Sequence, residues 1–152
     1  MGRELNRVLG MVGPLAFMEK TVREIMTTDV VTLSLNDTLR MADDIMALAS
    51  LRYFPVLEAK KVVGVVSWLD LIRASLASAV TRGEQPLREA LGMVAIRDVT
   101  MAPPISISPD RTIREAARLM VEKRIDCLLV LEGGSLIGLA TRTDLLREMA
   151  KL

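Results

Sequence analysis

An internal duplication is the feature of this sequence that most constrains its fold. Residues 22–76 align with residues 96–150 at one constant offset and without a gap. Identical residues recur along the whole alignment, as at Gly64 and Gly138. The period is longer than the units of about 20–50 residues from which solenoids are built. The chain is therefore predicted to hold two copies of one supersecondary unit, packed about a pseudo-twofold axis.

Each copy has the same order of expected elements. A short strand, at residues 30–33 or 105–107, is followed by a helix with apolar residues at helical spacing. Two further strands lie within residues 53–67 or 127–141, and a closing helix ends the copy. The first connection is a crossover and the second a hairpin. Each copy therefore predicts a β-α-β-β-α unit with a mixed three-stranded sheet, an α/β (α+β) fold.

The duplication also predicts how the chain is divided. We expect an N-terminal extension at residues 1–20 and a first repeat at residues 21–80. A linker at residues 81–94 then leads to a second repeat at residues 95–152. A three-stranded sheet with two helices on one face leaves its other face bare, so two copies can cover each other. This explains why the unit comes in a pair.

Composition excludes most catalytic chemistry. The chain has no histidine and a single cysteine, Cys127, which rules out His-based catalysis, an intramolecular disulfide and a cysteine zinc site. The net charge is +1, so no overall field attracts nucleic acid or an anionic membrane. Few aromatics and no basic stripe further disfavour nucleic-acid binding. We therefore expect no enzyme activity and no required cofactor.

The apolar residues point to self-association instead. They make up 51% of the 152 residues, more than so short a chain easily buries. The longest apolar stretch, residues 8–18, is shorter than the 18 or so residues that cross a bilayer. It would suit a dimer clasp or a docking helix. We expect a cytoplasmic homodimer built on the closing helices, with no membrane span.

One motif carries the candidate chemistry, and it occurs twice. The spacing Gly-x-x-Ser/Thr-x-x-Asp ends in Ser67 and Asp70 in the first copy and in Thr141 and Asp144 in the second. The hydroxyl falls where a strand passes into a helix, beside backbone N–H groups that favour a phosphate. A carboxylate three residues later can accept two hydrogen bonds, which suits the vicinal hydroxyls of a ribose.

The duplicated β-α-β-β-α order with this motif resembles the CBS domain family, and the chain is similar to a stand-alone tandem pair, or Bateman module. The strings Asp29-Val-Val-Thr-Leu and Phe54-Pro55-Val56-Leu57 also look like that family. The resemblance implies paired clefts that bind AMP, ADP, ATP or S-adenosylmethionine as regulatory ligands. It places adenine between the first strand and the segment before the second strand, and a phosphate near Arg142. The ligand-binding candidates are Thr141, Arg142, Asp144, Ile105, Cys127, Leu128, Ser67, Asp70, Val31, Tyr53 and Phe54.

Ser/Thr-x-x-Asp is also a helix capping box, which needs no ligand. Capping and binding are compatible roles for the same side chains. The two copies differ inside the motif, where the second has Arg142-Thr143 and the first has Trp68-Leu69. A phosphate site favours the cation, so we expect a nucleotide to prefer the second copy. Trp68 is interpreted first as a core or interface residue.

These features predict a regulatory ligand-sensing module that acts on a separate effector protein. The alternative is a structural or dimerisation module with degenerate clefts, which docks a partner through its apolar faces.

Overall fold

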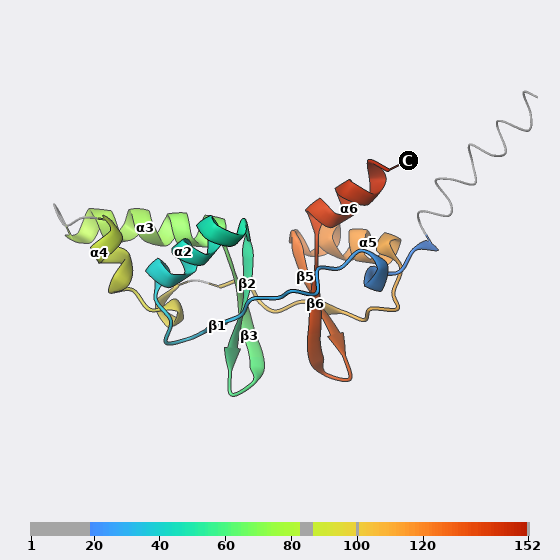
Figure 1. The fold of residues 1–152 in the computed structure, drawn as a ribbon, viewed down its shortest axis with the longest axis horizontal. Helices are drawn as coiled ribbons and strands as arrows, with labels where there is room; N and C mark the ends of the chain where they lie inside the picture. The colour runs from blue at the N-terminus through green and yellow to red at the C-terminus, as the bar shows by residue number, and fades with distance from the viewer. Residues whose placement is uncertain (1–18, 83–86, 100, 152) are drawn as a thin grey trace, which may run out of the picture. The chain divides into compact units, whose positions relative to one another are not determined.

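The computed structural model of the chain describes residues 19–82, 87–99 and 101–151. They form two compact units, each with its own core. Unit 2 is Val31–Pro104, and unit 1 joins the described residues before Val31 to those from Ile105 onward. The expected extension and linker lie partly outside the described residues. Figure 1 shows that each unit combines a small sheet with helices.

Unit 2 holds the strands β1 (Leu33–Ser34), β2 (Tyr53–Glu58) and β3 (Lys61–Ser67), in that spatial order. β1 pairs parallel with β2, and β2 pairs antiparallel with β3. The helices are α2 (Leu39–Ala49), α3 (Trp68–Arg82) and α4 (Leu87–Gly92), with a 3-10 turn at Ile96–Asp98. The predicted β-α-β-β-α order is confirmed, and α4 falls in the predicted linker.

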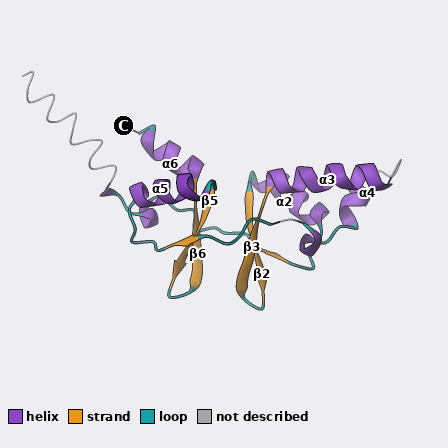
Figure 2. Cartoon of the chain, turned by 180° about the vertical axis from the view of Figure 1, so that it is seen from behind, coloured by secondary structure: helices purple, strands orange, loops and turns teal. Residues whose placement is uncertain are grey.

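Unit 1 repeats this plan with β4 (Ser106–Ile107), β5 (Cys127–Glu132) and β6 (Ser135–Thr141). β4 pairs parallel with β5, and β5 antiparallel with β6. Its helices are α5 (Ile113–Lys123) and α6 (Arg142–Met149), and a 3-10 turn at Val22–Glu24 precedes them. In each unit the helices lie to one side of the sheet, as Figure 2 shows. The predicted mixed three-stranded sheets are thus confirmed in both copies.

The first strand of each copy is shorter than predicted. Residues 30–33 were expected to form it, but β1 starts only at Leu33, because its parallel partners are limited to Val56 and Leu57. β4 likewise pairs only at Ser106 and Ile107. The β-branched residues before Leu33 form no ladder, and the Val30 N–H donates instead to the Thr28 carbonyl at 2.9 Å in a tight turn.

Local sequence explains where the middle helices begin. Thr112 accepts a hydrogen bond from the Glu115 N–H at 3.2 Å, and the Glu115 carboxylate accepts from the Thr112 N–H at 2.9 Å, a full capping box. In the other copy Thr38 accepts from the Met41 N–H at 3.3 Å, but methionine has no carboxylate with which to complete a capping box. The two helices therefore start at equivalent residues with caps of different strength.

The segment that leads each repeat packs in the unit of the other repeat. We call residues 21–30 leading segment 1 and residues 95–104 leading segment 2. Thr27 of leading segment 1 exchanges two backbone hydrogen bonds with Leu139 of β6, at 2.8 and 2.9 Å. Ala102 of leading segment 2 does the same with Val65 of β3, at 3.0 and 3.1 Å. Each compact unit therefore contains chain from both repeats, so its boundaries differ from those of the sequence repeat.

This exchange explains the glycine of the repeated motif. A Cβ built at Gly138 would lie 2.9 Å from Met26 Sδ and 2.9 Å from the Thr27 carbonyl oxygen. A Cβ at Gly64 would lie 2.9 Å from the Cβ of Met101. Both contacts are closer than side chains tolerate, so a leading segment can cross these strands only where no side chain stands.

Candidate functional site

The motif of the second repeat forms a closed hydrogen-bonded box at the junction of β6 and α6. Asp144 Oδ2 accepts from the Thr141 N–H at 2.8 Å and from the Thr141 hydroxyl at 2.6 Å. The Thr141 hydroxyl oxygen accepts in turn from the Asp144 N–H at 3.3 Å. Asp144 Oδ1 lies 3.4 Å from Arg147 Nη1, and the Asp144 side chain is only 7% exposed. The box thus holds a nearly buried carboxylate against the first turn of a helix.

The first repeat builds the same box with serine. Asp70 Oδ2 accepts from the Ser67 N–H at 2.9 Å and from its hydroxyl at 2.6 Å, and the Asp70 N–H donates back at 3.3 Å. Arg73 Nη1 lies 3.9 Å from Asp70 Oδ1, and the Asp70 side chain is 18% exposed. The two motifs therefore have the same geometry, with the second somewhat more enclosed.

In each unit the residue that follows the motif hydroxyl forms a backbone hydrogen bond with the residue that precedes the β-hairpin. The Arg142 N–H donates to the Asp126 carbonyl at 2.9 Å, and the Trp68 N–H donates to the Arg52 carbonyl at the same distance. Position 126 directly precedes β5, and position 52 directly precedes β2. The hairpin register thus fixes which side chain lies next to the motif in each unit.

The side chains at these two hydrogen-bonded positions differ between the units. In unit 1, Arg142 Nη1 forms an ion pair with Asp126 Oδ1 at 3.0 Å. In unit 2, the Arg52 guanidinium lies 5.9 Å from the centre of the Trp68 ring, a cation–π contact. Arg142 is 65% exposed, so a ligand in solution can reach its guanidinium. Unit 1 therefore offers a cation held by a replaceable carboxylate, whereas unit 2 offers a stacked Arg–Trp pair.

The strand residues predicted for the site divide into two groups. Cys127 lies opposite Thr141 in the β5–β6 register, and Tyr53 lies opposite Ser67 in the β2–β3 register. Phe54 and Leu128 are fully buried in the two cores, so only their backbones could meet a ligand.

The remaining candidates, Val31 and Ile105, lie just before the first strand of each unit. Ile105 accepts a backbone hydrogen bond from the Leu129 N–H at 2.9 Å, which places it beside β5. Val31 is 37% exposed at the start of unit 2. Val31 falls in unit 2 with Tyr53, Phe54, Ser67 and Asp70, whereas Ile105, Cys127, Leu128, Thr141, Arg142 and Asp144 fall in unit 1.

Cys127 is held as a neutral thiol. Burial, with a smaller contribution from the nearby carboxylates of Asp144 and Asp126, raises its pKa to about 12. A thiol with so high a pKa is a poor nucleophile at neutral pH. Cys127 is thus suited to line a site and not to react.

Sequence reasoning missed two groups of residues beside the motif. One is the pair Arg52 and Asp126, whose opposite charges occupy equivalent positions of the repeat. The charge reversal is visible in the aligned copies and could have been found. The other group is the leading segments, whose Thr27 and Ala102 cross the motif strands of the opposite repeat. No local sequence pattern indicates that these segments cross the strands of the opposite repeat.

Within the part of the chain that the structure describes, no cluster of three His, Cys, Asp or Glu side chains is placed to hold a metal ion. Within the same residues, no helix combines the length and the apolar character needed to cross a membrane.

Two β-α-β-β-α units, each carrying the same Gly-x-x-Ser/Thr-x-x-Asp box, define the chain as a tandem pair of small α/β modules. The CBS domain family model matches residues 22–77 and again residues 96–151. The chain therefore belongs to the CBS domain family. The resemblance noted from the sequence is confirmed.

The curated relatives place such pairs in proteins of different kinds. A CBS domain-containing protein of Dictyostelium discoideum is 27% identical over 137 residues, covering 89% of this chain and 94% of the relative. The inosine-5'-monophosphate dehydrogenase of Korarchaeum cryptofilum is 29% identical over 126 residues, covering 82% of this chain. The matched region makes up only 23% of that dehydrogenase. Some relatives of this chain are thus parts of much longer enzymes.

Solved structures confirm the fold. The CBS domain of a membrane protein from Sphaerobacter thermophilus has a TM-score of 0.77 at 24% identity, covering 94% of this chain and 96% of that one. CBSX2 in complex with AMP has a TM-score of 0.68 at 23% identity, covering 87% and 97%. The CBS domain of a bacterial CNNM/CorC family Mg2+ transporter in complex with ATP has a TM-score of 0.73 at 21% identity, covering 92% and 94%. A further CBS pair of the same fold holds 5'-methylthioadenosine and S-adenosyl-L-methionine.

Proposed function

We propose that this CBS pair is a regulatory module that binds an adenine nucleotide or a related adenosyl ligand and catalyses no reaction itself. The observation that carries the proposal is the pair of matching boxes, Thr141 with Asp144 and Ser67 with Asp70. Relatives of the same fold bind AMP, ATP and S-adenosylmethionine. AMP, ADP, ATP and S-adenosylmethionine are the ligands to consider.

The box of the second repeat has acceptors and donors suited to such a ligand. Asp144 Oδ2 is engaged by Thr141, whereas Oδ1 has Arg147 at 3.4 Å as its partner among the described residues. Oδ1 can therefore accept from a ribose hydroxyl without breaking the box. The Arg142 guanidinium is the donor for a phosphate here, because the N–H groups of Arg142 and Asp144 at the start of α6 already donate to the Asp126 carbonyl and the Thr141 hydroxyl. The backbone beside Cys127 and Ile105 would meet the adenine.

The second repeat is proposed as the preferred nucleotide site. A phosphate that recruits Arg142 has to replace Asp126 as its partner, and Arg142 is exposed enough to turn. In the first repeat the equivalent position is Trp68, which supplies no cation and is engaged by Arg52. Ser67, Asp70, Val31, Tyr53 and Phe54 would then serve a ligand with less negative charge.

A thermal-shift screen with AMP, ADP, ATP and S-adenosylmethionine tests the proposal. A ligand present at about 100 times its dissociation constant stabilises the folded protein by about 2.7 kcal/mol, which is an easily measured shift. We expect at least one of these ligands to raise the unfolding temperature. If none does so at millimolar concentration, the chain does not sense adenosyl ligands, and the structural module becomes the better account.

Calorimetry on matched variants then tests the site. Asp144→Ala should weaken binding by about 1–3 kcal/mol, as expected for the loss of a charge-assisted hydrogen bond. Asp70→Ala should weaken it much less. Glu115→Ala is the control, because it removes the carboxylate of another capping box in the same unit, away from the proposed site. Equal losses in Asp144→Ala and Glu115→Ala would mean that only stability had changed.

We propose further that the protein is a homodimer and acts on a separate effector protein. The closing helix α3 supports the dimer, since Leu76 and Val80 on it are 63% and 86% exposed. Sedimentation at micromolar concentration should give the dimer mass, and a monomer mass would contradict the proposal. These apolar residues also support the alternative of a purely structural, dimerising module.

A further inference from the structure

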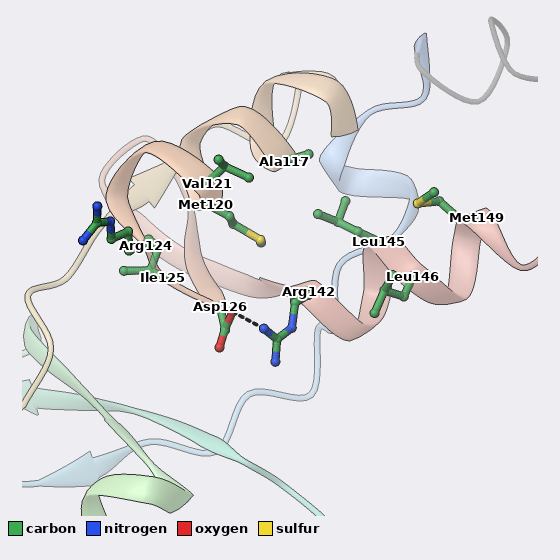
Figure 3. Close-up of a pocket in the computed structure, with 10 residues that line it drawn as sticks. All are labelled: Ala117, Met120, Val121, Arg124, Ile125, Asp126, Arg142, Leu145, Leu146 and Met149. Carbon is green, nitrogen blue, oxygen red and sulfur yellow. Dashed lines mark ion pairs between the residues drawn. The ribbon is translucent and has the colours of Figure 1, made fainter.

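A groove between α5 and α6 of unit 1 has an apolar lining that the described residues leave uncovered. Its volume is about 460 Å³. Figure 3 shows Met120 and Val121 projecting from α5 toward Leu145, Leu146 and Met149 of α6. Val121, Leu146 and Met149 are 80%, 55% and 52% exposed. Three strongly exposed apolar side chains thus gather along one groove, which makes it a candidate binding surface.

The equivalent groove of unit 2 has a different character. Its volume is about 330 Å³, and Asp43, Ser50 and Arg52 stand in its lining. The repeat places Ala117, Arg124 and Asp126 of unit 1 at the same positions. The apolar lining is therefore a property of unit 1 and does not follow from the fold that the two units share.

The described part of the chain begins at one end of this groove. Lys20 forms an ion pair with Glu148, the residue before Met149, and Glu19 lies 3.9 Å from Arg114 of α5. The Lys20 carbonyl accepts from the N–H of Ile113, the first residue of α5, at 2.8 Å. In Figure 3 the pale blue ribbon of this segment runs beside α6 at the end marked by Met149. Glu19, the first described residue, therefore lies at the mouth of the groove.

The preceding residues match the groove in polarity and length. Residues 8–18 carry no charge. Eleven residues span about 16 Å as a helix and more than that when extended, so in either form they reach along the eleven-residue α5. Gly10, Gly13 and Pro14 weaken an isolated helix, so the segment needs a surface to order it.

The charges at the far end of the groove also match. Arg124, Asp126 and Arg142 line that end, opposite Met149. A segment that runs from Met149 along the groove brings Arg7 and Glu4 to this end, where Glu4 can face Arg124 and Arg7 can face Asp126. The groove therefore changes from apolar to charged where a docked segment would change from the uncharged residues 8–18 to the charged residues before them.

We propose that residues 8–18 dock in the groove between α5 and α6 of their own chain. The segment covers Val121 and the exposed sides of Leu146 and Met149, and it leaves Leu76 and Val80 of α3 available for the proposed dimer. The proposal does not depend on nucleotide binding.

Methyl NMR on the full chain tests it. A nitroxide is attached at Val12→Cys in a Cys127→Ala background, and the methionine methyl groups are labelled with carbon-13. We expect the Met120 and Met149 signals to be lost when both labels are on one chain diluted with unlabelled protein. They should keep their intensity when nitroxide chains are mixed with separate carbon-13 chains. Signal loss in the mixture would assign the groove to a second copy, and no loss in either sample would mean that the segment does not dock; both results overturn the proposal.

A matched pair of variants checks the groove. Val121→Asp places a charge in the lining at an exposed position that tolerates it, so the Met120 and Met149 signals should reappear. Ala47→Asp makes the same change at the equivalent position of the unit 2 groove and should leave the signals lost. If Val121→Asp also leaves them lost, the segment does not occupy this groove.

Discussion

Gly138→Ala should destabilise the protein through the crossing of leading segment 1. The new methyl group would lie 2.9 Å from Met26 Sδ and 2.9 Å from the Thr27 carbonyl oxygen. Methionine can turn away, but this carbonyl accepts from the Leu139 N–H at 2.9 Å and is held in place by that bond. Relief therefore requires the backbone of the leading segment to move away from β6.

The expected cost combines two effects. Overpacking of a well-packed interior costs about 1–3 kcal/mol. Weakening one backbone hydrogen bond between Thr27 and Leu139 adds about 0.5–1.5 kcal/mol. Gly64→Ala should cost somewhat less, because the Met101 Cβ at 2.9 Å must shift but the nearest hydrogen-bonded backbone atom, the Ala102 carbonyl oxygen, is at 3.4 Å. We therefore expect Gly138→Ala to lose roughly 2–4 kcal/mol and Gly64→Ala roughly 1–3 kcal/mol.

Urea unfolding followed by circular dichroism measures both losses, provided that the slope with denaturant stays constant. Gly92→Ala is the control, because its nearest neighbour is Arg40 Nη1 at 3.7 Å, an ordinary contact, and alanine favours the helix. If Gly138→Ala unfolds at the same urea concentration as the parent protein, or if Gly92→Ala loses as much, the steric reason given for the motif glycine is wrong.

Three further predictions concern stability and reactivity. Cys127 should resist alkylation at pH 8 in the folded protein and react at once in denaturant, and stability should fall between about pH 9 and pH 12, where only the unfolded thiol ionises. Hydrogen bonds from Lys151 and Lys20 lower the pKa of Glu148, so its contribution is present above the usual glutamate pKa and is lost as the pH falls through the lowered value; Glu148→Gln should flatten the acid side of a pH–stability curve. Thr112→Ala should cost about 0.5–2 kcal/mol in urea unfolding, and more than Thr38→Ala, whose cap has no reciprocal bond; equal costs would contradict this.

The sequence by itself determined the repeated unit and its order of elements. Apolar periodicity placed α2 and α5, and the recurrence of Gly-x-x-Ser/Thr-x-x-Asp located both boxes. These features are local, since a helix or a cap depends on residues a few positions apart. The asymmetry between Arg142 and Trp68 was visible for the same reason.

Only the tertiary structure decided which copy each leading segment joins. Leading segment 1 pairs with β6 of the second repeat through Thr27, and leading segment 2 pairs with β3 of the first repeat through Ala102. Pairing between residues so far apart depends on the surface that each strand leaves open, which no sequence period encodes. The same holds for Asp126 beside Arg142 and for the apolar groove between α5 and α6, because both arise where separate elements pack together.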